Sequence, residues 1–142
     1  MEINELIVSD AALNVIDNGA WVEGLFEDKS VALFVIGQNS EEVQKFIQAE
    51  QAAARVANGG KPLTTEDLTK IRIKTLGRVI IKDHRGFTSN GKPLKFDREQ
   101  VAGWVESRNG AEFAGMIALA SNRIDSDAES FVEAVTKNSS PA

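Results

Sequence analysis

The chain has 142 residues, of which 42 % are hydrophobic and 26 % are charged, the balance of a folded globular protein and not of a disordered one. It contains no cysteine, which excludes disulfide bonds, thiolate catalysis and cysteine-ligated metal sites. Its longest apolar run, residues 31–36, is far shorter than the roughly 20 residues that span a bilayer. The first residues are acidic and have no signal-peptide pattern. We therefore expect a cytoplasmic protein of one domain with no membrane partner.

The net charge of −5 hides three blocks of different sign. Residues 1–69 carry a net charge of −8, residues 70–98 carry +7, and residues 99–142 carry −4. Opposite charges on separate segments suit head-to-tail contacts between copies of the chain, or one acidic and one basic partner. The alternative is that these charges are solvated and pair within the fold.

The first part of the chain has signals typical of strands. Asn18-Gly19 is typical of a tight hairpin turn, because both central positions of such a turn need a positive φ. We expect strands on either side of it, at residues 13–17 and 20–26, and a second turn at residues 27–29. Residues 31–36 form a β-rich apolar run that ends at Gly37, which predicts a strand covered on both faces. This region is thus predicted to be a short antiparallel meander.

From Ser40 the pattern becomes helical. Ser40 is a good N-cap, and apolar residues then follow the helical period until Asn-Gly-Gly-Lys-Pro at residues 58–62 ends the helix. A second helix is expected to begin at Thr64 or Thr65 and to end at Gly86. A loop follows, in which Asn90-Gly91 is another turn signal.

Three more helix starts are predicted from capping patterns. Asp97 with Gln100 has the spacing of a capping box, and Phe96 and Val101 occupy the positions of a hydrophobic staple. The same capping spacing recurs at two later places, Asn109 with Glu112 and Ser126 with Glu129.

Together these signals predict an α+β fold, with a small N-terminal antiparallel β meander followed by a mostly helical body of four to five helices. We expect a single domain over residues 1–137, β-rich over 1–37 and helical over 40–137, and a frayed tail at 138–142. Trp21 and Trp104 fall on apolar faces. Core packing is the favoured interpretation for both, and a place at the rim of an assembly surface is the alternative.

No pattern in the sequence predicts catalysis. His84, the only histidine, follows an aspartate, but no serine, cysteine or metal-ligand spacing accompanies it, so we expect a partly exposed side chain at a helix end. Residues 58–61 lack the Gly-Lys-Ser/Thr ending of a phosphate-binding loop. The acidic groups at residues 41–42 and 125–127 fit helix starts. We therefore expect no enzymatic activity, no cofactor and no metal.

A basic stripe is the most unusual feature of the sequence. Its first four members recur every four residues on one face of the predicted second helix, and a fifth lies just beyond. We take these five residues as candidates for partner binding: Lys70, Lys74, Arg78, Lys82 and Arg85. Such a stripe suits nucleic-acid phosphates. The chain is acidic overall and has no tyrosine for base stacking, however, which favours a protein partner or a solvated face.

Residues 79–97, Val-Ile-Ile-Lys-Asp-His-Arg-Gly-Phe-Thr-Ser-Asn-Gly-Lys-Pro-Leu-Lys-Phe-Asp, resemble a pattern in the tail assembly chaperones of long-tailed phages and prophages. There, a helix ending in β-branched residues runs into an aromatic, a glycine and a turn, and Gly-x-Pro-Leu-x-aromatic-Asp/Ser opens the next helix. The order of the other elements is similar, from a Gly-x-Trp-Val strand at residues 19–22 to a late Phe131. The resemblance spans roughly residues 18–135. One departure is His84, which stands where the pattern has a tryptophan before the glycine.

The resemblance implies a small, non-enzymatic protein of the host-cell cytoplasm that is absent from the finished particle. Such a protein would bind the tape measure protein, keep it soluble and recruit tail tube protein during assembly. Self-association is also expected, because a coat of many weak contacts gives avidity for a long client. Two other functions stay open: a minor tail or connector protein retained in the virion, and a small nucleic-acid-binding regulator that uses the basic stripe.

Overall fold

The computed structural model describes residues 1–138, with side chains described for residues 1–135. Within this part the fold is α+β and mostly helical, as predicted. Three short turns of other helix types (3-10 at Ile3–Glu5 and Arg108–Gly110, π at Leu76–Ile80) accompany the main elements. In chain order these are α1 (Asp10–Asn18), β1 (Ala20–Val22), β2 (Ala32–Val35), α2 (Glu41–Ala57), α3 (Thr65–Thr75), β3 (Ile81–Arg85), β4 (Thr88–Ser89), β5 (Lys92–Pro93), α4 (Arg98–Glu106), α5 (Ala111–Ser126) and α6 (Ala128–Asn138).

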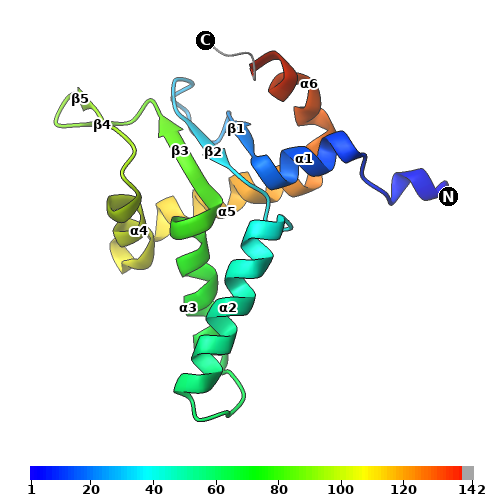
Figure 1. Ribbon diagram of the computed structural model, residues 1–142. Helices are drawn as coiled ribbons and strands as arrows, with labels where there is room; N and C mark the ends of the chain where they lie inside the picture. The colour runs from blue at the N-terminus through cyan, green and yellow to red at the C-terminus, as the bar shows by residue number, and fades with distance from the viewer. Residues whose placement is uncertain (139–142) are drawn as a thin grey trace.

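The centre of the fold is a three-stranded antiparallel sheet in the order β1-β2-β3, with α5 packed against it (Figure 1). Residues 31–36 form or flank the central strand, and all of them except Phe34 are buried, which confirms the predicted strand. The side chains of α5 that meet this core, among them Ile117 and Ile124, are fully buried. The sheet and α5 therefore supply the apolar interior that holds the outer helices.

The prediction that residues 1–37 form a β meander is wrong in its first element. Residues 10–18 are the helix α1, because Ser9 caps it through the Ala12 N–H and Ala12, Val15 and Ile16 bury one helical face. Gly19 does have the positive φ that Asn18-Gly19 indicated, at 88°, but it ends the helix by donating its N–H to the Val15 carbonyl. The region thus runs helix then strand, and the third strand of the sheet comes from residues 81–85.

The second predicted helix ends earlier than expected. It starts at the predicted place, where Thr64 forms a capping box with Asp67, but α3 stops at Thr75. One π turn follows, which contains the buried Val79 and Ile80, and the chain then extends into β3, where the buried β-branched Ile81 pairs with Val35 of β2. Gly77 lies in the π turn, where a Cβ atom would come within 3.0 Å of the Ala102 Cα on α4. The helix-to-strand change is therefore packed tightly against α4.

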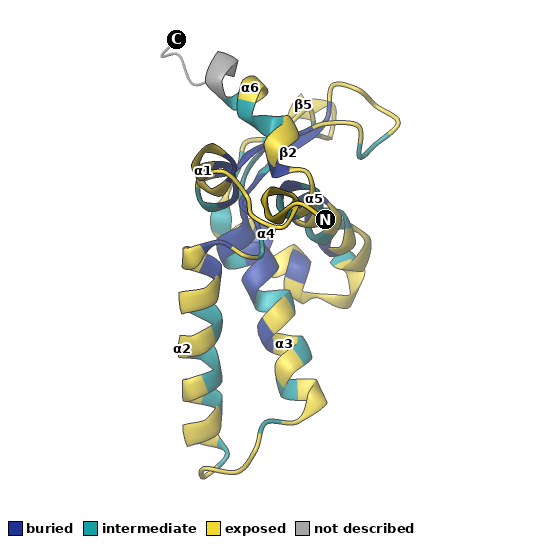
Figure 2. Ribbon diagram, turned by 90° about the vertical axis from the view of Figure 1, so that its right-hand side faces the viewer, coloured by how far each residue is buried: buried dark blue, intermediate teal, exposed yellow. Residues whose placement is uncertain are grey.

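The two helices α2 and α3 form a hairpin that projects from the body of the molecule (Figures 1 and 2). Ser40 caps α2 as predicted, accepting a hydrogen bond from the Val43 N–H at 3.3 Å. Val43 is the one buried residue of α2, and the far half of the helix is mostly exposed (Figure 2). Among the described residues, no helix is both long and apolar enough to cross a membrane.

Of the three later helix starts, only the first is where the capping pattern placed it. Asp97 accepts a hydrogen bond from the Gln100 N–H at 3.1 Å at the start of α4. Asn109 lies in a 3-10 turn before α5, and Ser126 is the last residue of α5 instead of a cap. Glu129 accepts a hydrogen bond from the Ser9 N–H at 3.0 Å, because α6 lies beside α1. Of the tail predicted to fray at 138–142, residues 139–142 lie outside the described part.

Candidate functional site

The five residues of the predicted basic stripe do not share one free surface. Lys70 and Lys74 lie on α3, Arg78 lies in the π turn, and Lys82 and Arg85 lie on β3, so the single helical face that the spacing predicted does not form. Each of the five makes an intramolecular ion pair: Lys70–Glu66 at 3.3 Å, Lys74–Glu50 at 2.9 Å, Arg78–Glu99 at 3.3 Å and Arg78–Glu106 at 3.5 Å, Lys82–Glu42 at 2.5 Å, and Arg85–Glu23 at 2.6 Å.

These ion pairs account for much of the charge asymmetry of the sequence. The acidic partners come from both acidic blocks, on α2, α3 and α4 and in the segment after β1. Since all the pairs are at least partly exposed, each contributes only about 0–1 kcal/mol to the free energy of unfolding. The sequence left two explanations of the charge pattern, contacts with other chains and pairing within the fold. At these five positions the structure shows pairing within the fold.

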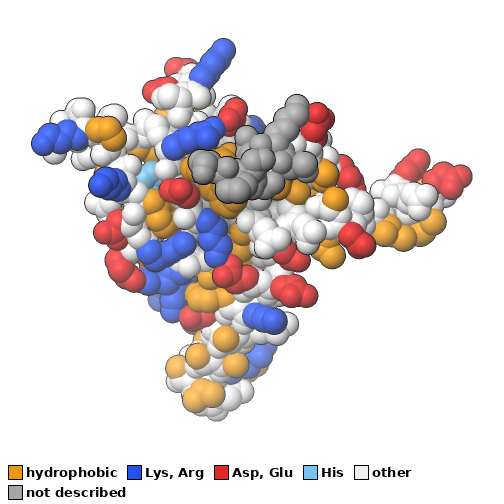
Figure 3. All heavy atoms as spheres, turned by 45° about the horizontal axis from the view of Figure 1, so that its top comes forward, with side chains coloured by type: hydrophobic (Ala, Val, Ile, Leu, Met, Phe, Trp, Pro, Cys, Tyr) orange, Lys and Arg blue, Asp and Glu red, His pale blue; other side chains and the backbone are white. Residues whose placement is uncertain are grey.

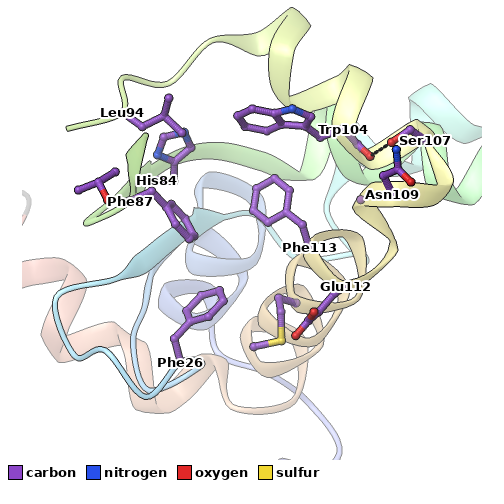
Figure 4. Close-up of a pocket in the computed structure, with 12 residues that line it drawn as sticks. Phe26, His84, Phe87, Leu94, Trp104, Ser107, Asn109, Glu112 and Phe113 are labelled. Carbon is purple, nitrogen blue, oxygen red and sulfur yellow. Dashed lines mark hydrogen bonds between the residues drawn. The ribbon is translucent and has the colours of Figure 1, made fainter. Parts of the chain in front are cut away.

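The structure instead brings aromatic side chains together around an apolar pocket of about 460 Å³. The pocket lies between the start of the β4–β5 hairpin, α4, the first turns of α5 and the segment between β1 and β2 (Figure 4). Its volume falls within the range of roughly 300–1,000 Å³ typical of ligand sites. The lining side chains are mostly apolar or aromatic: Phe26, His84, Phe87, Thr88, Leu94, Trp104, Ser107, Asn109, Gly110, Glu112, Phe113 and Met116.

Edge-to-face ring contacts fix the shape of this pocket. Phe87 is central to them, with ring centroids 5.6 Å from Phe26, 5.4 Å from His84 and 6.0 Å from Phe113. Trp104 extends the series, 6.3 Å from Phe113. Each such ring pair stabilises the fold by about 0.5–1.5 kcal/mol beyond the stabilisation that comes from burying the apolar surface of the rings. The rings therefore hold one another in place, and the pocket is preformed.

His84 forms part of the pocket wall and is the least satisfied polar side chain near it. Only 5 % of the residue is exposed, and neither Nδ1 nor Nε2 has a hydrogen-bond partner. Its ring lies between Phe87 and Phe96, at a centroid distance of 5.4 Å from each. Burial lowers the pKa of His84 below its ordinary value, and the charge of Asp83 offsets this in part. The expectation of a partly exposed histidine at a helix end is therefore wrong, and the buried ring favours its neutral form.

Both tryptophans lie at surfaces and not deep in the core. Trp104 is 39 % exposed at the edge of the pocket, where one edge of its ring meets Phe113. Trp21 is half-buried, packs edge-to-face on Phe34 at 5.4 Å and carries the Arg85 guanidinium over its ring at 4.5 Å. The prediction of core packing is therefore wrong for Trp104, and a place at the rim of an assembly surface stays a prediction.

One charged residue lines the pocket, the acidic Glu112. Three exposed basic residues, Lys92, Lys95 and Arg108, lie close in sequence to lining residues but do not themselves line the pocket. They make no ion pair with any residue that the structure describes.

Asp125, one of the acidic residues that the sequence analysis assigned to a helix start, has a structural role. The Asp125 carboxylate, in the last turns of α5, accepts hydrogen bonds from the Gln38 N–H at 2.9 Å and the Asn39 N–H at 3.2 Å. Burial raises the pKa of Asp125 above its ordinary value, although these two hydrogen bonds oppose the change. A helix does begin beside residues 125–127, since α6 starts at Ala128, but Asp125 belongs to the last turn of α5 and holds the turn before α2.

Sequence reasoning did not find the pocket. One signal was present, since the segment that carries the family resemblance supplies four wall residues, His84, Phe87, Thr88 and Leu94. Among the described residues, no group of three or more His, Cys, Asp or Glu side chains is placed to hold a metal ion. Comparisons with protein-family models, with curated proteins and with solved structures found no match to this chain.

Proposed function

We propose that this chain is a non-enzymatic assembly chaperone of the kind found in long-tailed phages and prophages. It acts in the host-cell cytoplasm, binding tape measure and tail tube proteins, and its aromatic pocket takes apolar side chains of these partners. One observation carries the proposal. The segment that resembles the chaperone pattern, residues 79–97, is the segment that builds one wall of the preformed pocket.

The chemistry of the pocket suits a protein client better than a small substrate. Its walls offer ring edges and half-exposed apolar side chains, while the one buried polar ring, that of His84, has its nitrogens covered. In the described part, no serine or threonine hydroxyl donates a hydrogen bond to His84 and no carboxylate accepts one from it, so no activated nucleophile accompanies it. Weak apolar contacts of this kind, repeated along a coat, hold a long aggregation-prone client by avidity.

The ion pairs of the basic stripe argue against the nucleic-acid alternative. Lys74 and Lys82 are engaged with Glu50 and Glu42, so phosphate binding there would have to break intramolecular pairs. The stripe is also divided between a helix and a strand. We therefore place the function at the aromatic pocket and not at the stripe.

Co-expression tests this proposal. The tape measure protein encoded with this chain should be largely insoluble alone and soluble when the chain is present. Trp104→Asp, which puts a charge at the pocket edge, should abolish the rescue. Leu119→Asp is the matched control, because Leu119 is similarly exposed, at 42 %, but lies outside the pocket. Equal rescue by both variants would remove the pocket from the proposal, and no rescue by the wild type would remove the chaperone function.

Mass spectrometry of purified virions separates the chaperone from a structural tail protein. A chaperone should be absent from finished particles, whereas a minor tail or connector protein should be present at a fixed number of copies. Recovery at stoichiometric levels would favour the structural alternative.

A further inference from the structure

The aromatic pocket carries a negative charge that no described residue of the chain neutralises. Glu112, in the first turn of α5, is exposed and is the charged side chain of the lining (Figure 4). It makes no ion pair with any residue that the structure describes. His84 adds no positive charge to the lining, because burial lowers its pKa and favours the neutral ring. The pocket therefore combines aromatic surface with an unpaired carboxylate.

The rings of the pocket are themselves attractive to a cation. An aromatic ring carries partial negative charge over its face, and tryptophan holds a cation better than phenylalanine or tyrosine does. Trp104 is 39 % exposed on the lining, and Phe26, Phe87 and Phe113 are half-buried beside it. Rings and carboxylate thus favour the same occupant, a positively charged side chain with an apolar stem.

The chain already holds two of its own arginines in this way. The Arg85 guanidinium lies over the Trp21 ring, 4.5 Å from its centroid, and pairs with Glu23 at 2.6 Å. The Arg98 guanidinium lies over the Phe96 ring at 4.9 Å and also donates to backbone carbonyl oxygens. Neither of these rings lines the pocket. The pocket offers the same combination of tryptophan and glutamate as Trp21 with Glu23, but no described arginine lines it.

We infer that the aromatic pocket binds an arginine side chain of a protein partner, with the guanidinium against the rings and paired with the Glu112 carboxylate. The stem of the arginine and neighbouring apolar residues of the partner fill the rest of the space. The inference rests on the proposed function in one respect, that the pocket takes segments of proteins. It adds that the segment is basic as well as apolar.

Arginine suits this pocket better than lysine. Its guanidinium is planar and more weakly hydrated than an ammonium group, so it stacks on aromatic rings at a smaller cost in lost hydration. It can also direct two N–H groups at one carboxylate. A purely apolar segment is the alternative occupant, and it would leave Glu112 without a role in binding.

Nuclear magnetic resonance on the full chain tests the inference with two short peptides. The first is acetyl-Leu-Arg-Leu amide, and the second has citrulline in place of arginine, which keeps the shape of the side chain but removes its charge. The arginine peptide should shift the indole N–H signal of Trp104 and leave that of Trp21, which lies outside the pocket, in place. The citrulline peptide should bind at least about fivefold more weakly, as expected for loss of a cation contact with aromatic rings.

A pair of charge-removing variants locates the effect. Glu112→Gln should weaken binding of the arginine peptide by about two- to fivefold and leave binding of the citrulline peptide unchanged, since only a charged ligand feels the lost carboxylate. Glu5→Gln is the matched control, because it makes the same change of charge outside the pocket. Glu5 belongs to the N-terminal segment, which projects away from β4, β5 and α4 (Figure 1) and where Figure 3 shows acidic and hydrophobic side chains together.

Three results would overturn the inference. The first is equal binding of the arginine and citrulline peptides at Trp104. The second is an arginine peptide that shifts Trp21 or no indole signal at all. The third is an equal effect of Glu112→Gln and Glu5→Gln on the arginine peptide, which would show that only the net charge of the chain matters. The spectra of both variants also report whether each is folded.

The failure of this inference can be told apart from the failure of the proposed function. If both peptides bind alike but the tape measure protein still needs Trp104 for solubility, the pocket holds clients by apolar contacts alone and the arginine is wrong. If the arginine peptide binds with the expected dependence on Glu112 but the tape measure protein is indifferent to Trp104→Asp, the arginine site stands and the chaperone function at the pocket does not.

Discussion

Replacing His84 by phenylalanine should stabilise this protein, which is unusual for a substitution at a buried position. The ring lies between Phe87 and Phe96, and both its nitrogens are buried without hydrogen-bond partners. Each unsatisfied buried polar group costs about 1–3 kcal/mol. His84→Phe removes both and keeps an aromatic ring in the same cluster. The larger ring returns some strain, since overpacking costs about 1–3 kcal/mol. We expect a net gain of about 1 kcal/mol at pH 7.5.

The gain should grow as the pH falls. Because burial lowers the pKa of His84 in the folded protein, the unfolded chain binds a proton first on acidification. The contribution of neutral His84 to the free energy of unfolding is therefore fully present above about pH 6.5, the ordinary histidine pKa. It is lost as the pH falls from there toward the lower pKa of His84 in the folded protein. The loss approaches about 1.4 kcal/mol per pH unit for one proton. His84→Phe has no such group and should lack this part of the pH dependence.

Urea unfolding at pH 7.5, 6.5 and 5.5, followed by circular dichroism, measures both effects. Asp125, whose raised pKa gives the opposite pH dependence, is present in both proteins, so the difference between them isolates His84. A difference that stays constant with pH would show that His84 is not buried in its neutral form. A variant less stable than the wild type at every pH would contradict the expected gain: either the His84 ring has a hydrogen-bond partner, or the strain of the larger ring exceeds the cost of the two buried nitrogens.

Three further substitutions test the packing by chemical denaturation. Trp104→Ala should cost only about 1–2 kcal/mol, while Ile117→Ala, in the fully buried part of α5, should cost about 2–5 kcal/mol; the reverse order would place Trp104 in the core. Asp125→Ala should cost about 1–3 kcal/mol because two backbone N–H groups lose their acceptor, and Asp125→Asn, which keeps an acceptor oxygen, should cost less. Gly86→Ala should cost at least about 1–3 kcal/mol, since Gly86 has a φ of 88° and an added Cβ atom would overlap the Ser30 carbonyl oxygen; an unchanged midpoint would contradict that backbone conformation.

Local signals in the sequence predicted the helix starts that depend on nearby residues only. The caps at Ser40, Thr64 and Asp97 are all present, because a capping side chain and its N–H partner lie three residues apart. The Asn90-Gly91 turn is also where the sequence placed it, joining β4 to β5 with positive φ at both residues.

Signals that have two physical meanings could not be resolved from the sequence. A positive-φ glycine such as Gly19 either turns a hairpin or ends a helix, and only the burial of Val15 and Ile16 on one helical face selects the second. Likewise, residues 81–85 fit the end of a helix by spacing. They form β3 because β2 offers a strand edge to which they pair, a contact far away in the chain.

The candidate site was missed for the same reason. The stripe residues were chosen by spacing along a helix, but their acidic partners lie as far as 62 residues away, as Glu23 does from Arg85. The pocket gathers rings from separate segments, such as Phe26, Phe87 and Phe113, and nothing in the sequence near any one ring indicates the others. Burial of His84 is equally a product of tertiary packing. The resemblance at residues 79–97 was the one sequence signal that pointed to this place.

The most direct test of the account is to identify what touches the pocket while tails are being assembled. A photo-crosslinking amino acid at Thr88, an exposed residue of the pocket wall, should capture the tape measure or tail tube protein in tail-producing cells. The same amino acid at Val56, exposed at the far end of α2, is the control and should capture neither at a comparable level. Capture of tail proteins at Val56 but not at Thr88 would contradict the account.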